Sequence, residues 1–178
     1  ILVAATKQIE ILGILLCNPP QKVVFRAQDT TANFKGLRFD NSGGSLLNKA
    51  SIEFAGGNKI LSSSMIVSNC RFYKNDYSMA SAALDIFTCN PTIVNCVFER
   101  NQRSAIMTAM NAASSPTILN CRFIANSTLN SNRPQINLGS GSTTPIILRG
   151  NYIEGAYSVV GGISMALLAG GSSTIVID

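Results

Sequence analysis

The sequence contains no histidine, no Cys-x-x-Cys pair and no cluster of lysine and arginine, and only 13% of its 178 residues are charged. The first two absences argue against a zinc site, and we expect neither a metal nor a cofactor. Without a basic cluster beside aromatic residues, the sequence does not support nucleic-acid binding. Low charge together with 46% hydrophobic residues excludes a disordered tail, so we expect the chain to fold.

Leader and membrane segments are also missing from the sequence. Residues 1–16 have no basic start and no uninterrupted apolar run, so they do not resemble a signal peptide. Residues 156–177 carry no charge, but glycine and serine dilute their hydrophobicity, and we expect no transmembrane helix. We expect residues 1–178 to form a single segment of a longer protein whose natural start lies upstream.

The residues that are present favour short strands joined by tight turns. The chain has 14 glycines, and its apolar residues come in short bursts instead of helical stripes. The net charge of +5 mildly favours an anionic partner such as acidic polysaccharide. Five cysteines, an odd number, argue against a fully disulfide-paired framework, and we expect buried thiols.

A repeat is visible in the middle of the chain. The pattern Asn-Cys-x-Phe-x-x-Asn occurs at residues 69–75, 95–101 and 120–126, at spacings of 26 and 25. The first Asn of each copy interrupts two short alternating apolar segments, which indicates a sharp corner where positive φ favours Asn or Gly. Degenerate copies extend this series, and the predicted corner residues are Gly13, Gly36, Asn69, Asn95, Asn120 and Gly150.

Steps near 25 residues predict a right-handed parallel β-helix with three short strands per coil and about six to seven coils, an all-β solenoid. Stacked coils would align Cys70, Cys96 and Cys121 in one interior row and Phe72, Phe98 and Phe123 in a second. Asn75, Asn101 and Asn126 would line a second turn and bond to the backbone of the next coil. A further strand per coil is predicted at residues 52–54, 84–86, 106–108, 136–138 and 163–165.

These residues resemble the parallel β-helix repeats of the pectin-lyase-like superfamily, and most closely those of polymorphic outer-membrane proteins. The shared signature is Phe-x-x-Asn, and Gly161-Gly162-Ile163 is similar to the Gly-Gly-Ala-aliphatic element of that family. The corresponding segments 82–84 and 104–106 lack the two glycines. The resemblance implies a secreted or surface-displayed segment that serves as an adhesin or rigid spacer, and does not by itself imply catalysis.

Two acidic residues are the candidates for catalysis. Glu53 and Asp85 occupy outward positions of the predicted central strand, where adjacent carboxylates could divide acid and base roles. The following outward positions are not acidic, and the Asp-Asp pair and Arg-x-Lys element of galacturonan hydrolases are missing. We therefore favour a solvated surface over an active site.

The binding candidates are outward arginines and one tyrosine: Arg38, Arg71, Arg122 and Tyr152. Such a stripe could hold uronic acids or sulfated sugars through bidentate contacts, although solvated arginines are the simpler interpretation. Asn126-Ser127-Thr128 matches the N-glycosylation pattern, with Asn126 as the acceptor. Thr92 and Thr117 align in only two coils, which argues against an ice-binding face.

Three functions remain open from the sequence. The first is a structural or adhesive segment of a secreted or cell-surface protein, whose partners are acidic glycans or surface proteins. The second is a lyase or hydrolase module acting on acidic polysaccharide. The third is a polymerising subunit whose open ends stack on neighbouring coils.

Overall fold

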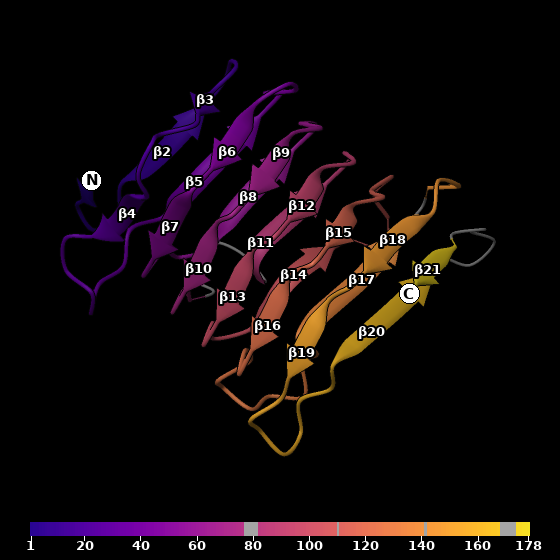
Figure 1. Ribbon diagram of the computed structural model, residues 1–178. Helices are drawn as coiled ribbons and strands as arrows, with labels where there is room; N and C mark the ends of the chain where they lie inside the picture. Colours follow the sequence, from indigo (N-terminus) through magenta and orange to yellow (C-terminus); the bar gives the residue numbers. More distant parts are fainter. Residues whose placement is uncertain (77–81, 110, 141, 168–173) are drawn as a thin grey trace.

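The computed structural model describes residues 1–76, 82–109, 111–140, 142–167 and 174–178, and in these residues it has 21 β-strands and no helix. The strands form three seven-stranded parallel sheets, and each sheet takes every third strand of the chain. One coil therefore contains one strand from each sheet, and the coils stack from the indigo N-terminal end to the yellow C-terminal end in Figure 1. The prediction of three short strands per coil in a parallel β-helix is confirmed.

The three sheets are named A, B and C in the order in which the chain visits them. Sheet A contains β1 (Leu2–Val3), β4 (Val23–Ala27), β7 (Ala50–Glu53), β10 (Arg71–Tyr73), β13 (Val97–Glu99), β16 (Arg122–Ile124) and β19 (Tyr152–Glu154). Sheet B contains β2 (Gln8–Ile11), β5 (Gly36–Asp40), β8 (Asn58–Leu61), β11 (Ala82–Phe87), β14 (Ser104–Thr108), β17 (Ile136–Ser140) and β20 (Ile163–Leu167). Sheet C contains β3 (Leu16–Cys17), β6 (Leu46–Asn48), β9 (Ile66–Ser68), β12 (Thr92–Val94), β15 (Thr117–Leu119), β18 (Ile146–Arg149) and β21 (Ile175–Ile177).

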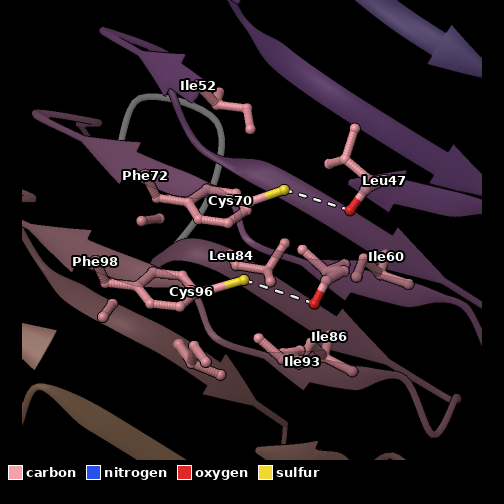
Figure 2. Packing of buried hydrophobic residues seen from close by; sticks show 14 of the residues in the cluster. Leu47, Ile52, Ile60, Cys70, Phe72, Leu84, Ile86, Ile93, Cys96 and Phe98 are labelled. Atoms are coloured by element: carbon pink, nitrogen blue, oxygen red, sulfur yellow. Dashed lines mark hydrogen bonds between the residues drawn. The ribbon is translucent and has the colours of Figure 1, made fainter. Parts of the chain in front are cut away.

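The predicted phenylalanine row lies in the centre of the core. Phe72 pairs with Phe98 and Phe98 with Phe123, one per coil, and all three are at most 1% exposed. The rings of Phe72 and Phe98 are 4.7 Å apart at 3°, and those of Phe98 and Phe123 are 5.2 Å apart at 8°. Figure 2 shows the first of these pairs beside the sheet B and sheet C aliphatic side chains that complete the core.

The predicted cysteine row lies at the corner between sheets C and A. Cys70, Cys96 and Cys121 are at most 2% exposed, and their thiols donate to backbone carbonyls, as Cys70 does to Ser68 O at 3.1 Å. Asn151 takes the cysteine place in the next coil, where its amide donates to Ile118 O at 2.9 Å. All five cysteines are free thiols, which confirms the expectation of buried, unpaired sulfurs for this row.

Asparagine side chains close the corner between sheets A and B, here called the AB corner. Asn75, Asn101 and Asn126 are 0% exposed, and each takes part in hydrogen bonds to the neighbouring coil. Asn101 Oδ1 accepts from the Asn75 backbone N–H at 2.9 Å, and Asn126 Oδ1 accepts from Asn101 Nδ2 at 2.7 Å. The predicted second turn with amide-to-backbone bonds is therefore confirmed.

Gln135 extends this asparagine ladder by one step. Its Oε1 accepts from Asn126 Nδ2 at 2.9 Å, and its Nε2 donates to Glu154 O at 2.8 Å. Gln135 reaches this place from the connection that precedes β17, outside the repeated motif. The sequence pattern gave no indication of this role.

The corner between sheets C and A holds most of the predicted corner residues. Asn69, Asn95, Asn120 and Gly150 all have φ between 51° and 62° and stack in one row. Their backbone N–H groups donate to the next coil, as Asn69 N does to Val94 O at 3.0 Å. Their alignment confirms the repeat that defines the fold.

Gly13 and Gly36 were wrongly placed in that row. Lys49, with φ of 53°, is the corner residue between β6 and β7, whereas Gly36 begins β5 of sheet B and Gly13 precedes β3 of sheet C. Gly36 has φ of 99°, and a Cβ there would lie 2.2 Å from the Gly57 carbonyl oxygen. A glycine is thus needed at position 36 because of this close approach, and not because the residue forms the predicted corner.

The predicted central strand was correct for four of its five members. The segments that begin at 84, 106, 136 and 163 are neighbours in sheet B, but Ile52 and Glu53 belong to β7 of sheet A. Their place in sheet B is taken by β8 (Asn58–Leu61), because Leu84 pairs with Asn58. Ile52 instead pairs with Phe72 and continues the phenylalanine row.

Cys89 provides a pH prediction. Its side chain is buried, and burial raises the pKa of its thiol above the ordinary value. The folded chain then keeps a proton that the unfolded chain loses above about pH 8.5, so the stability contribution is complete below that pH and falls as the pH rises, by up to about 1.4 kcal/mol per pH unit. Urea unfolding at pH 7.5 and 9.5 should show a smaller loss of stability for Cys89→Ala than for the wild type. Equal losses would contradict this assignment.

Candidate functional site

A groove of about 390 Å³ runs along the outside of the AB corner, and we call it the AB groove. Its lining residues come from successive coils and from the connections beside them. They are Thr30, Asn33, Phe54, Lys74, Arg100, Gln102, Thr128 and Tyr157. Together they offer two cations, two aromatic rings and four neutral side chains able to form hydrogen bonds.

The asparagine ladder explains why the floor of the groove points outward. Phe54, Lys74 and Arg100 each directly precede a buried residue of the AB corner, and each has positive φ, between 49° and 55°. Their backbone N–H groups donate to the next coil, as Arg100 N does to Ile124 O at 3.0 Å. These bonds hold the three side chains at the coil spacing of roughly 4.8 Å.

Positive charge dominates the floor of the groove. The ammonium of Lys74 lies 5.9 Å from the Phe54 ring centre, and the Arg26 guanidinium lies 5.3 Å from it. Arg100 is within 3.8 Å of Glu99 through its Nε, but Glu99 is held more closely by Arg71, at 2.8 Å. Because Glu99 is shared and the Arg100 side chain is 58% exposed, an anion in the groove could still be bound by both cations.

Longer connections stand at both ends of the groove. Residues 28–35 contribute Thr30 and Asn33, and the Asn33 amide donates to the Asp76 carboxylate. At the other end, residues 125–135 and 155–162 contribute Thr128 and Tyr157. Figure 1 shows these connections extending from the lower side of the stack, in indigo and in orange to yellow.

The two connections at the C-terminal end brace each other. Asn130 Oδ1 accepts from the backbone N–H of Val159 at 3.1 Å, and Asn130 Nδ2 donates to the Ser158 hydroxyl at 3.4 Å. Thr128 N also donates to Asn101 O at 3.1 Å, which ties this wall to the ladder. Hydrogen bonds therefore fix the C-terminal wall of the groove to the stacked coils of the β-helix.

The predicted arginine stripe is only partly present. Arg71, Val97, Arg122 and Tyr152 are neighbours in one outward row of sheet A, as expected. Arg38 does not belong to this row, because it lies in sheet B beside Lys59 and forms ion pairs with Asp40 at 2.7 Å and Glu10 at 3.2 Å. The error follows from placing Gly36 at the wrong corner.

Internal contacts occupy much of that stripe. Arg71 binds Glu99 and lies 4.0 Å from the Tyr73 ring centre. Arg122 lies 5.4 Å from the Tyr152 ring centre, and the Tyr152 hydroxyl donates to Glu154 at 3.1 Å. That bond and the negative charge of Glu154 raise the pKa of Tyr152 above its ordinary value. The row is thus committed to cation–π contacts and ion pairs within the sheet.

Glu53 and Asp85 are not adjacent, contrary to the prediction. Glu53 lies in sheet A beside Tyr73, where it accepts from the Ser51 hydroxyl at 2.9 Å and lies 3.7 Å from Arg71. Asp85 lies in sheet B beside Lys59 and is 2% exposed. The two carboxylates therefore do not form the pair that shared acid and base roles require.

Asn126 is an interior residue of the ladder. Its Nδ2 donates to Phe98 O and to Gln135 Oε1, both at 2.9 Å, and the residue is 0% exposed. A sugar attached at this nitrogen would replace one of its two hydrogens, break at least one of these bonds, and need space that the buried residue does not have. The glycosylation prediction thus applies only to the chain before this coil folds.

Sequence reasoning missed the three floor residues of the groove. A usable signal exists for two of them, since Lys74 and Arg100 each directly precede the last Asn of a motif copy. An inward Asn at the corner leaves the preceding side chain outside. Within the described residues, no group of three or more His, Cys, Asp or Glu side chains is arranged to hold a metal ion.

The stacked parallel strands and the three rows of corner residues define a parallel β-helix. In comparisons with known proteins, the family description of the right-handed β-helix region matches residues 13–177. The chain therefore belongs to the right-handed β-helix family, which confirms the predicted handedness and fold. No curated protein and no solved structure matches the chain. None of the residues described forms a helix that is long and apolar enough to cross a membrane.

Proposed function

We propose that this chain is a structural and adhesive segment of an extracellular or cell-surface protein, and that it holds acidic glycans on the outside of its β-helix. The observation that carries the proposal is the AB groove, where Lys74 and Arg100 lie next to each other between two aromatic side chains. Concave sites with aromatic surfaces and a few fixed polar groups are typical of ligand binding.

The rigid scaffold under the groove supports a binding role. The ladder residues below its floor are 0% exposed and bonded from coil to coil, so the floor is already ordered before a ligand arrives. A preformed site loses little conformational freedom on binding, and more of the interaction energy then appears as affinity.

The charge of the chain supports an anionic partner. The whole sequence carries a net charge of +5, and two of its cations lie on neighbouring coils in the groove floor. Arginine binds carboxylate groups in bidentate geometry, and a sulfate group presents a similar pair of acceptor oxygens. The charge pattern thus favours acidic over neutral glycans.

Affinity electrophoresis tests the proposal. The intact chain would be run through gels that contain polygalacturonate, a sulfated polysaccharide or a neutral glucan. We expect retardation in at least one acidic gel, less retardation as salt screens the charges, and none in the neutral gel. Passage through both acidic gels without retardation would contradict the proposal. Shortened polysaccharide products in the same mixtures would assign an enzymatic role instead.

A further inference from the structure

The length of the AB groove is set by the coils that build it. Phe54, Lys74 and Arg100 stand on three successive coils, Thr128 follows on the fourth and Tyr157 on the fifth. At roughly 4.8 Å per coil, these four steps span roughly 19 Å. One pyranose unit is about as long as the coil spacing, so the groove matches about four sugar units.

The two cations are also in register with such a chain. Lys74 and Arg100 occupy the same place in adjacent coils, one coil spacing apart. Acidic groups on two neighbouring sugar units would therefore each meet one cation. Neutral hydrogen-bonding side chains, among them Gln102 and Thr128, remain for the sugar hydroxyls.

The ends of the groove limit the length of its ligand. The connection 28–35 stands at one end, and the braced connections that carry Thr128 and Tyr157 stand at the other. A chain lying on the floor meets a wall in both directions. At the C-terminal end, the Tyr157 ring offers a face on which a sugar ring can pack, whereas the cations of Arg26 and Lys74 already lie over the Phe54 ring.

From this geometry we infer that the AB groove binds an anionic oligosaccharide of about four units, with its acidic groups on two adjacent units at Lys74 and Arg100. The inference rests on the proposed function and specifies its site and ligand. It also favours a sugar chain over an acidic peptide, since the neutral side chains and ring faces match hydroxyls and pyranose rings.

Calorimetric titration of the intact chain with uronate oligomers of two to eight units tests the inference. Affinity should rise with length up to about four units and then stay level, at one ligand per chain. Sulfated oligomers of the same lengths form a second arm, which identifies the acidic group that binds more tightly. Binding in either arm with this length dependence supports the inference.

Lys74→Ala combined with Arg100→Ala should weaken binding about tenfold or more, because each loses a charge-assisted contact. Alanine fits this backbone, since Ala125 occupies the next place in the same corner row with φ of 49°. The control is Lys22→Ala combined with Arg149→Ala, which removes the same number of positive charges from exposed positions outside the groove. It should change the affinity less than about twofold.

Three results would overturn the inference: equal losses in both double variants, affinity that keeps rising with length, or equal binding of a neutral oligomer or an acidic peptide. If the acidic gels still retard the chain in any of these cases, the proposed adhesive function stands and only the assignment to this groove is wrong. If the acidic gels also fail to retard the chain, both the proposed adhesive function and the assignment to this groove are wrong.

Discussion

Substitution of Asn101 with alanine is expected to lower the free energy of unfolding by about 4 kcal/mol or more. Asn101 is 0% exposed and bonds to both neighbouring coils. Without its amide, the Asn75 N–H has no partner, the Phe72 carbonyl loses the donor Asn101 Nδ2 at 3.1 Å, and Asn126 Oδ1 loses a donor. The stranded N–H costs about 1–3 kcal/mol, and each further lost hydrogen bond costs about 0.5–1.5 kcal/mol.

Asn137→Ala is the matched control for Asn101→Ala. Asn137 is a partly exposed, outward-facing strand residue of sheet B, beside the buried Ile136. We expect its replacement to change the free energy of unfolding by less than about 0.5 kcal/mol. Urea unfolding followed by far-ultraviolet circular dichroism measures both variants. Similar small losses for the two would show that the buried ladder contributes no more than a surface amide.

Phe98→Ala is expected to cost about 3–5 kcal/mol of unfolding free energy. Phe98 is 0% exposed and stacks on Phe72 and Phe123, so its removal opens a cavity and breaks two ring contacts at once. Each ring contact adds about 0.5–1.5 kcal/mol beyond the burial itself. The loss is measured from the shift of the denaturant midpoint between wild type and variant, provided that the dependence of the unfolding free energy on denaturant concentration is unchanged.

The position of Phe98 in the row supplies a graded test. Phe98→Leu keeps most of the buried volume but loses both ring contacts, and it should cost less than the alanine variant. Leu is accommodated by the neighbouring coils, since Ile52 and Ile153 occupy the same row at either side of the three rings. Equal losses for Leu and Ala would mean that the ring contacts, not the buried volume, dominate.

The fold was predictable where the coils are least interrupted. Three copies of one motif at spacings of 25 and 26 fix which residues stack, and each copy carries its own corner Asn, core Phe and ladder Asn. The early coils were harder, because glycine is used for more than one purpose. Gly36 matched the corner pattern, yet a glycine is needed there because a Cβ would collide with the Gly57 carbonyl oxygen.

The corners themselves follow a rule that residue type alone does not reveal. Lys49, Lys74, Arg100 and Ala125 all have positive φ, a conformation that costs a residue with a Cβ roughly 1–2 kcal/mol. The backbone N–H of each donates to the next coil, and this repeated bond outweighs the local preference. A search for Gly and Asn therefore finds only part of the corners.

The candidate site was less predictable than the fold. The register of Glu53 depended on assigning Ile52 to a sheet, and an apolar-polar-apolar triplet fits any of the three. The groove depends on side chains outside the motif and on connections of different lengths, which have no period. Only Lys74 and Arg100, each beside a ladder Asn, could have been found from the pattern.

Equivalent residues of successive coils lie on top of one another, and ring-to-ring nuclear Overhauser effects in the chain with labelled phenylalanine would detect this stacking. We expect cross-peaks from the Phe98 ring to both the Phe72 and Phe123 rings, at 4.7 and 5.2 Å between centres. We expect no direct peak between Phe72 and Phe123, because Phe98 separates them. A Phe72–Phe123 peak without the two Phe98 peaks would contradict the order of the coils.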